Sequence, residues 1–300
     1  MKKIVIFTAL VMSVTLLSIG SVLAGEKIDK TLDVASEGDV EIANNRGKID
    51  VAGWDKNKVS VKGELDDLTE KFIFSTSGNK TIIKVELPDR STSSRSGKGS
   101  NLKIFVPKKF NVQFDGIATD ISISDIESNV DISSVSGDIR LEQVESRVFI
   151  NSVSGNIDIK NIDGAIEIST VSGGVKAAVS SKNIIVGGVS SDISVKADVI
   201  ESAQISTVSG DSNLSGHLAN GGSIKLSNVS GDSHFFAKSD LNADILLGTG
   251  PGGDVVNQYS DDKPTRSFIG SEKLKFTAGK GKGLIKMSTV SGKIGISREK

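Results

Sequence analysis

One short stretch, Val135-Ser136-Gly137-Asp138-Ile139, returns along the chain and decides the fold. Its copies begin at Val153-Ser154-Gly155, Val171-Ser172-Gly173, the variant Val189-Ser190-Ser191, Val208-Ser209-Gly210 and Val229-Ser230-Gly231. The valines are 18, 18, 18, 19 and 21 residues apart. A fixed period of this length is typical of stacked arrays, with one short coil per repeat. The sequence therefore predicts an all-β protein, a single-stranded β-solenoid (β-helix) with coils of about 18 residues.

A second period of nine residues lies inside each repeat. Apolar residues fall at one position, two residues later and three residues after that, as in Ile139, Leu141 and Val144. The next unit repeats the pattern with Val148, Ile150 and Val153. Alternation at period two is typical of a strand, and the third position follows a change of direction. We expect two strands and two corners per coil, with about six apolar side chains buried.

The corners carry glycine followed by a column of small polar residues. That column reads Asp138, Asn156, Gly174, Asp192, Asp211 and Asp232. Glycine reaches positive φ without penalty, so it suits a tight corner. Calcium binding along the column is one interpretation, but the Gly-Gly-x-Gly-x-Asp pattern of calcium β-rolls is missing. Asp and Asn that cap turns are the favoured interpretation, so we expect no metal site.

The N-terminus has the pattern of a secretory signal peptide. Two lysines precede an apolar run from Ile4 to Ile19, and small residues lead to Ala24. A transmembrane anchor is the alternative, but polar residues interrupt the run. We expect a signal peptide over residues 1–24, and hence export to the periplasm or the cell surface with no membrane span after cleavage. The chain has no cysteine, which excludes disulfides and a cysteine-linked lipid.

The remaining 25–300 is expected to form one domain with four parts. An irregular β-rich start covers 25–118, regular coils cover 119–233, an irregular segment covers 234–283, and a closing coil with a charged end covers 284–300. The start contains Trp54, the only tryptophan. It could stack on a ligand, but a plug over the end of the core is the favoured interpretation.

Composition and spacing argue against several functions. The formal net charge is −1, and no basic patch with interleaved aromatic residues suggests nucleic-acid binding. His217 and His234 occur at different distances from their Val-Ser-Gly markers, so stacked coils would not bring them together. Outward positions do not concentrate the paired acids that a glycosidase needs. We expect no catalytic residues, no cofactor and no enzyme activity.

Strand alternation also predicts which residues face outward. One face should present Arg140, Asp158, Lys176 and Ser194. The other should present Phe149, Glu167, Ile185 and Gln204. Phe149 and Ile185 are the two apolar members of these rows, about two coils apart. They are the candidate contact face, although single apolar residues on a surface are common.

Several motifs in a fixed order resemble the bacterial putative-adhesin family of unknown function. They are Gly47-Lys48-Ile49-Asp50-Val51, Leu102-Lys103-Ile104-Phe105-Val106-Pro107, the Val-Ser-Gly-Asp-Ile units, and the closing Val290-Ser291-Gly292-Lys293-Ile294. The resemblance implies a β-solenoid domain in an envelope protein and supplies no catalytic residues.

The predicted function is therefore a non-catalytic, adhesin-like envelope module that presents a solenoid face to a protein or glycan partner. A self-assembling envelope scaffold is one alternative, because uncapped coils could stack end to end. A polysaccharide-active β-helix enzyme is the other.

Overall fold

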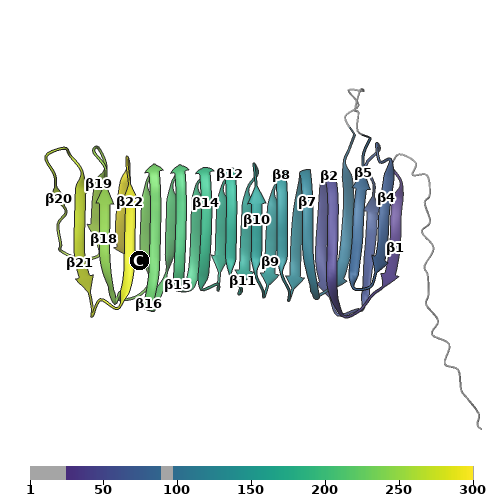
Figure 1. Cartoon of the computed structure of the whole chain (residues 1–300), viewed down its shortest axis with the longest axis horizontal. Helices are drawn as coiled ribbons and strands as arrows, with labels where there is room; N and C mark the ends of the chain where they lie inside the picture. The colour runs from purple at the N-terminus through teal and green to yellow at the C-terminus, as the bar shows by residue number, and fades with distance from the viewer. Residues whose placement is uncertain (1–24, 89–96, 300) are drawn as a thin grey trace, which may run out of the picture.

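The computed structural model describes residues 25–88 and 97–299. Within these ranges the protein is all-β, with 23 strands and no helix, which confirms the predicted class. The strands form a long stack of coils that runs from the N-terminal part to the C-terminal part of the chain (Figure 1). The expected signal peptide lies outside the described residues.

Each regular coil contributes one strand to each of two sheets, called sheet 1 and sheet 2. Four long strands run around a corner and belong to both sheets: β2 (Glu37–Trp54), β7 (Lys109–Ile126), β15 (Ile193–Ser209) and β16 (Ser212–Ser230). Sheet 1 also contains β4 (Lys71–Ser77), β5 (Lys80–Glu86), β8 (Val130–Ser136), β10 (Val148–Ser152), β12 (Ile166–Ser172), β14 (Asn183–Ser190), β18 (Ala243–Thr249), β20 (Thr265–Arg266), β21 (Glu272–Ala278) and β22 (Gly283–Thr289). Sheet 2 also contains β1 (Lys27–Asp33), β3 (Lys58–Glu64), β6 (Ser100–Pro107), β9 (Ile139–Val144), β11 (Ile157–Ile162), β13 (Val175–Val179), β17 (Ser233–Ala237), β19 (Asp254–Gln258) and β23 (Lys293–Arg298).

Strands of neighbouring coils pair in parallel, with equivalent residues side by side. In sheet 2, Ile139 pairs with Ile157 and Ile157 with Val175, each 18 residues further along the chain. In sheet 1, Val148 pairs with Ile166 in the same way. The predicted 18-residue offset is therefore the offset between paired strands. A slip of one residue would turn the apolar side chains outward, so the alternating pattern fixes this register.

The core lies between the two sheets and consists mainly of Ile, Val and Leu. Ile139, Leu141, Val144, Val148 and Ile150 are all 2% exposed or less, as predicted. The prediction for Val153 is wrong, because this side chain is 49% exposed. The valines of the other Val-Ser-Gly units are exposed to the same degree, so a coil buries fewer apolar side chains than the expected six.

The backbone explains why two similar corners differ. Gln143 has a φ of 57°, and this left-handed residue breaks the alternation so that Val144 turns into the core. No such residue lies between Ile150 and Val153. Alternation continues there, Ser152 takes the inward position, and its hydroxyl donates a hydrogen bond to the carbonyl of Ser154 at 3.2 Å. Val153 consequently points to solvent.

The glycine corners are sterically constrained. Gly155 has a φ of 115°, and a Cβ added there would lie 2.1 Å from the carbonyl oxygen of Gly137 in the preceding coil. A Cβ added at Gly173 would likewise lie 2.1 Å from the carbonyl oxygen of Gly155. Any side chain would push neighbouring coils apart, so glycine is required at these corners.

The polar column beside the glycines links the coils by hydrogen bonds. The Asp138 carboxylate accepts a hydrogen bond from the backbone N–H of Asn156 at 3.0 Å, and the side-chain Oδ1 of Asn156 accepts one from the backbone N–H of Gly174 at 3.1 Å. Asp192 and Asp211 accept the equivalent N–H groups of the following coils. The column therefore satisfies corner N–H groups as expected of capping residues, but each side chain accepts from the corner of the next coil and not from its own turn.

The closing coil is not the last coil in space. β22 lies between β16 and β18 (Figure 1), and by strand pairing β23 lies between β17 and β19. Val-Ser-Gly 290–292 therefore continues the corner column, with Ser291 bridged to Ser230. The charged end of the closing coil therefore does not lie at the end of the stack, because Arg298 and Glu299 follow a strand inside it.

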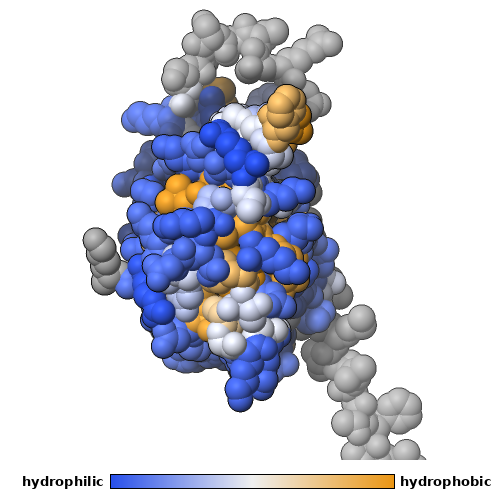
Figure 2. Space-filling view, turned by 90° about the vertical axis from the view of Figure 1, so that its left-hand side faces the viewer, coloured by the Kyte–Doolittle hydropathy of each residue, from blue (hydrophilic) through white to orange (hydrophobic). Residues whose placement is uncertain are grey.

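Antiparallel strands complete both ends of the stack. At the N-terminal end, β1 pairs with β3, β3 with β6, and β4 with β5. At the other end, β21 pairs with β18 and β20 with β21. Figure 2 looks onto this second end, where apolar patches interrupt a mostly hydrophilic surface. In the described part of the chain, no helix is long and apolar enough to cross a membrane.

A buried ion pair fixes the N-terminal part. Asp66 has a side chain only 1% exposed, and Arg46 donates to it from Nε and, at 2.8 Å, from Nη2. Burial alone would raise the pKa of Asp66. The hydrogen bonds from Arg46 and the Leu68 backbone outweigh burial and hold the pKa of this carboxyl below its ordinary value.

Candidate binding surfaces

The predicted outward rows are present. Arg140, Asp158, Lys176 and Ser194 follow one another across sheet 2, and Phe149, Glu167, Ile185 and Gln204 do so across sheet 1. Phe149 and Ile185 therefore share a row, but Glu167 separates them. Phe149 is partly covered by Arg147, whose guanidinium lies 5.9 Å from the ring centroid, whereas Ile185 is 49% exposed. This candidate face contains only two separated apolar side chains.

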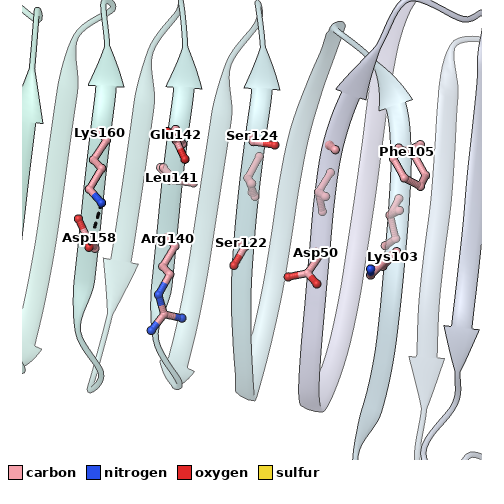
Figure 3. Close-up of a pocket in the computed structure, with 14 residues that line it drawn as sticks. Asp50, Lys103, Phe105, Ser122, Ser124, Arg140, Leu141, Glu142, Asp158 and Lys160 are labelled. Atoms are coloured by element: carbon pink, nitrogen blue, oxygen red, sulfur yellow. Dashed lines mark ion pairs between the residues drawn. The ribbon is translucent and has the colours of Figure 1, made fainter.

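A more continuous hollow crosses sheet 2, with a volume of about 430 Å³. Two rows line it, and both cross β6, β2, β7, β9 and β11. The first row is Lys103, Asp50, Ser122, Arg140 and Asp158, and the second is Phe105, Ala52, Ser124, Glu142 and Lys160. Ser122 and Ser124 form a low floor because their side chains are short, and the larger side chains stand on either side (Figure 3). We call this the sheet 2 groove.

The sheet 2 groove carries three basic and three acidic side chains. Lys160 lies 4.0 Å from Asp158 in its own strand, and Lys48, outside the groove, lies 3.2 Å from Asp50. Among the described residues, Lys103 and Glu142 make no ion pair within 4.0 Å. They lie on opposite banks of the serine floor, so a ligand along the groove meets a free cation and then a free anion.

Trp54 stands beside this groove and not over the end of the core, so the plug interpretation is wrong. It stacks on Phe105 with ring centroids 5.2 Å apart, and its Nε1–H donates to the Lys58 carbonyl at 2.7 Å. Lys56 lies over the indole ring at 4.9 Å. Contacted by both Phe105 and Lys56, the indole of Trp54 supports Phe105 on the bank of the groove.

A second continuous surface lies at one edge of sheet 1. The exposed valines of the Val-Ser-Gly units stack in register there with an isoleucine before them: Ile117, Val135, Val153, Val171, Val189, Val208, Val229 and Val290. Each is between 45% and 56% exposed. We call this column the valine ladder. Sequence analysis missed it because the valines were assigned to the core.

The histidines do not form a site together. His234 pairs in register with Asn213, four residues before His217, so the two rings lie well apart on neighbouring strands. Burial lowers the pKa of His234, whose Nε2 lies 2.8 Å from the Ser297 hydroxyl. His217 hydrogen-bonds to Ser239. Over residues 25–88 and 97–299, no group of three or more His, Cys, Asp or Glu side chains is arranged to hold a metal ion.

Comparison with known proteins identifies the family. The model of the Toastrack DUF4097 family matches residues 21–186, which is more than half of the chain. The protein belongs to this family. Two solved structures are also similar to the chain. A "putative cell adhesion protein" from Clostridium sporogenes has 11% identity and a TM-score of 0.24, with coverage of 91% of this chain and 100% of the other. A "putative adhesin" from Bacteroides fragilis has 14% identity and a TM-score of 0.42, with coverage of 90% and 97%.

No curated protein matches the chain. The Toastrack family model ends inside β14, so it does not cover the C-terminal coils or the inserted closing coil.

Proposed function

We propose that this Toastrack protein is a non-catalytic, exported envelope module, a single-stranded β-solenoid that binds an extended segment of a partner protein in the sheet 2 groove. The observation that carries the proposal is the serine floor of Ser122 and Ser124 between two charged banks. Neighbouring strands lie about 4.8 Å apart, so the five strands of the groove span about 19 Å. An extended peptide of about six residues has that length.

The charges favour a protein segment over a glycan. A uronate polymer would meet Asp50, Glu142 and Asp158 on the groove walls, and like charges in contact oppose binding. A neutral glycan commonly stacks on aromatic rings, and Phe105 is the one aromatic side chain among the lining residues. A peptide with one acidic and one basic side chain could pair with Lys103 and Glu142 together. The Phe149–Ile185 face stays a weaker candidate for the same contact.

The absence of enzyme activity is also part of the proposal. Hydrolysis or elimination needs an acid and a base that converge on one substrate atom. In the groove, Asp158 lies 4.0 Å from Lys160 of the second row. The serine floor separates Glu142 from Asp50. Export is supported by the N-terminal pattern of the sequence.

The test uses the protein from residue 25 onward, immobilised and exposed separately to envelope proteins and envelope polysaccharides of the source organism, with and without calcium. We expect retention of a protein ligand, no retention of glycan and no cleavage. Ser124→Trp fills the floor and should abolish retention, whereas Gln204→Trp, an outward position of sheet 1, should not.

Charge reversal gives a second matched pair. Lys103→Glu should weaken retention, and Lys225→Glu, exposed on sheet 1, should leave it unchanged. Equal retention by all four variants would exclude the sheet 2 groove, and loss only in Phe149→Ser with Ile185→Ser would move the site to sheet 1. Cleavage of any polysaccharide would refute the non-catalytic assignment.

A further inference from the structure

We infer that two copies of this chain dimerise through the valine ladder, with their solenoids parallel and in register. The inference is independent of the sheet 2 groove, because the ladder lies at an edge of sheet 1.

The ladder is a ridge with a hollow beside it. A groove with a volume of about 760 Å³ runs along the ladder from Ile117 to Val189. Small side chains line it in one column: Ser133, Asn151, Ser169, Gly187 and Ser206. A surface that carries a ridge and an adjacent groove at the same spacing is complementary to itself.

The surface is also nearly free of charge. Three adjacent columns of eight positions cover it: the valine ladder, the groove column from Asp115 to Ser288, and the column from Ala118 to Ser291 that holds the serines of the Val-Ser-Gly units. Asp115 is the single charged residue among these 24 positions, although 24% of the whole chain is charged. Depletion of charge is what distinguishes the centre of a protein–protein interface from ordinary surface. An uncharged surface has no cationic side chains that would bind a nucleic acid or an acidic glycan.

Symmetry selects the arrangement of the two copies. A two-fold axis parallel to the ladder places the ridge of each copy in the groove of the other, with equivalent coils at the same height. A two-fold axis across the ladder would press ridge against ridge and leave both grooves empty. Isologous two-fold contacts are the commonest form of homodimer. We therefore expect Val153 of one copy to contact Asn151 of the other.

The dimensions of the surface limit the area that a dimer can bury. Seven steps along the ladder give a length of about 34 Å, and four residues across give a width of about 13 Å. The two copies together would bury on the order of 900 Å², below the roughly 1,200 Å² of a standard stable interface. We expect a reversible dimer with a dissociation constant in the micromolar range, and not a permanent one.

Sedimentation equilibrium of the protein from residue 25 onward, from low micromolar to about millimolar concentration, measures this constant. Val171→Lys puts a charge on the ridge and should raise the dissociation constant at least about tenfold. Ile185→Lys is the matched control, because Val171 is 48% exposed and Ile185 is 49% exposed on the next coil, outside the three columns. The control should stay within about twofold of the unchanged protein. A protein that is monomeric at every concentration, or dimers equally sensitive to both substitutions, would overturn the inference.

Cysteine cross-linking tests the arrangement, since the chain has no cysteine of its own. A mixture of Asn151→Cys and Val153→Cys proteins should form a disulfide dimer under mild oxidation, because a disulfide needs Cα atoms within about 7 Å. Asn151→Cys mixed with Val229→Cys, four coils away, should not. Cross-linking of Val135→Cys with Val229→Cys would instead show antiparallel ladders and refute the parallel arrangement.

Discussion

Substitution of a corner glycine tests the steric account of the stack most directly. In Gly155→Ala the new Cβ would lie 2.1 Å from the Gly137 carbonyl oxygen, against about 3.3 Å for the closest ordinary carbon–oxygen contacts. The φ of 115° adds a backbone cost of about 1–3 kcal/mol for any residue other than glycine. Relief of the clash separates two coils and weakens hydrogen bonds worth about 1 kcal/mol each. We expect a loss of about 3–5 kcal/mol in local stability.

The matched control is Gly187→Ala, another glycine of the stacked coils. It has no positive φ, and its added Cβ would meet no atom closer than 3.9 Å. This substitution should change stability by less than about 0.5 kcal/mol, or increase it slightly by restricting the unfolded chain.

Coils of a repeat protein can open separately, so a single melting temperature would mix several events. Hydrogen exchange of the amides from Ile139 to Ile159, measured alongside urea denaturation, reports the opening of the affected coils. Faster exchange confined to these coils in Gly155→Ala is the expected result. If Gly155→Ala and Gly187→Ala were equally mild, the corner would be free to relax and the steric argument would fail.

Three further predictions have defined outcomes. Gly188→Thr should destabilise the protein, because the new Cβ would lie 2.8 Å from the Cβ of Ser191. Adding Ser191→Gly should restore stability, so a double-mutant cycle should give a coupling energy of about 1 kcal/mol or more. Asp66→Asn should lower the free energy of unfolding by about 3 kcal/mol at pH 7. Because the folded pKa of Asp66 is lowered, the difference in unfolding free energy between this variant and the unchanged protein should shrink as pH falls below about 4, as measured by urea titrations. Gln143→Gly should raise thermal stability by about 0.5–1 kcal/mol, since glycine adopts the φ of 57° without strain.

The regular coils could be predicted because two periods act together. Alternation assigns each residue to the inside or the outside, and the 18-residue repeat aligns equivalent residues of neighbouring coils. The outward rows through Arg140 and Phe149 follow from these two rules alone. The polar column through Asp138 was assigned to turn caps for the same reason, because its members recur at the corner.

The burial of the corner valines was mispredicted because two corners look alike in the sequence. Val144 and Val153 each follow an apolar pair by three residues, yet one is buried and the other exposed. A usable signal was present: strict alternation from Val148 and Ile150 reaches Ser152, which places Val153 outside. The left-handed turn at Gln143 has no comparable signal, since glutamine rarely adopts that conformation.

The variant unit also shows a limit of pattern matching. Serine replaces the corner glycine at Ser191, and Gly188 replaces the inward polar residue that the preceding coil provides with Thr170. Ser191 is 3% exposed, and its side chain occupies the space that the absence of a side chain at Gly188 leaves open. The sequence shows both departures, but only the structure shows that one compensates for the other.

The position of the closing coil in the stack cannot be predicted from a local sequence pattern. Gly292 stacks on Gly231, 61 residues earlier, while the coil of β18 and β19, between them in sequence, lies further out. A repeated motif specifies that a coil can join the column but not which coil it joins. The sheet 2 groove is similar, because its lining comes from five separated segments of the chain, and the motifs at Asp50 and Lys103 were recognised only as family features.

The uniformity of the valine ladder requires a cause other than the fold. On the outward row beyond the groove column, residues range from Asp131 to Phe149 to Glu167, so stacked coils tolerate almost any residue at an outward position. Contact between successive valines favours a β-branched residue at the corner, but threonine would satisfy that preference as well. Val171→Thr therefore separates the two causes. If stacking within one chain is the whole reason, dimerisation should be absent or unchanged; if the ladder is an interface, the stability of the monomer should change little while the dissociation constant of the dimer rises.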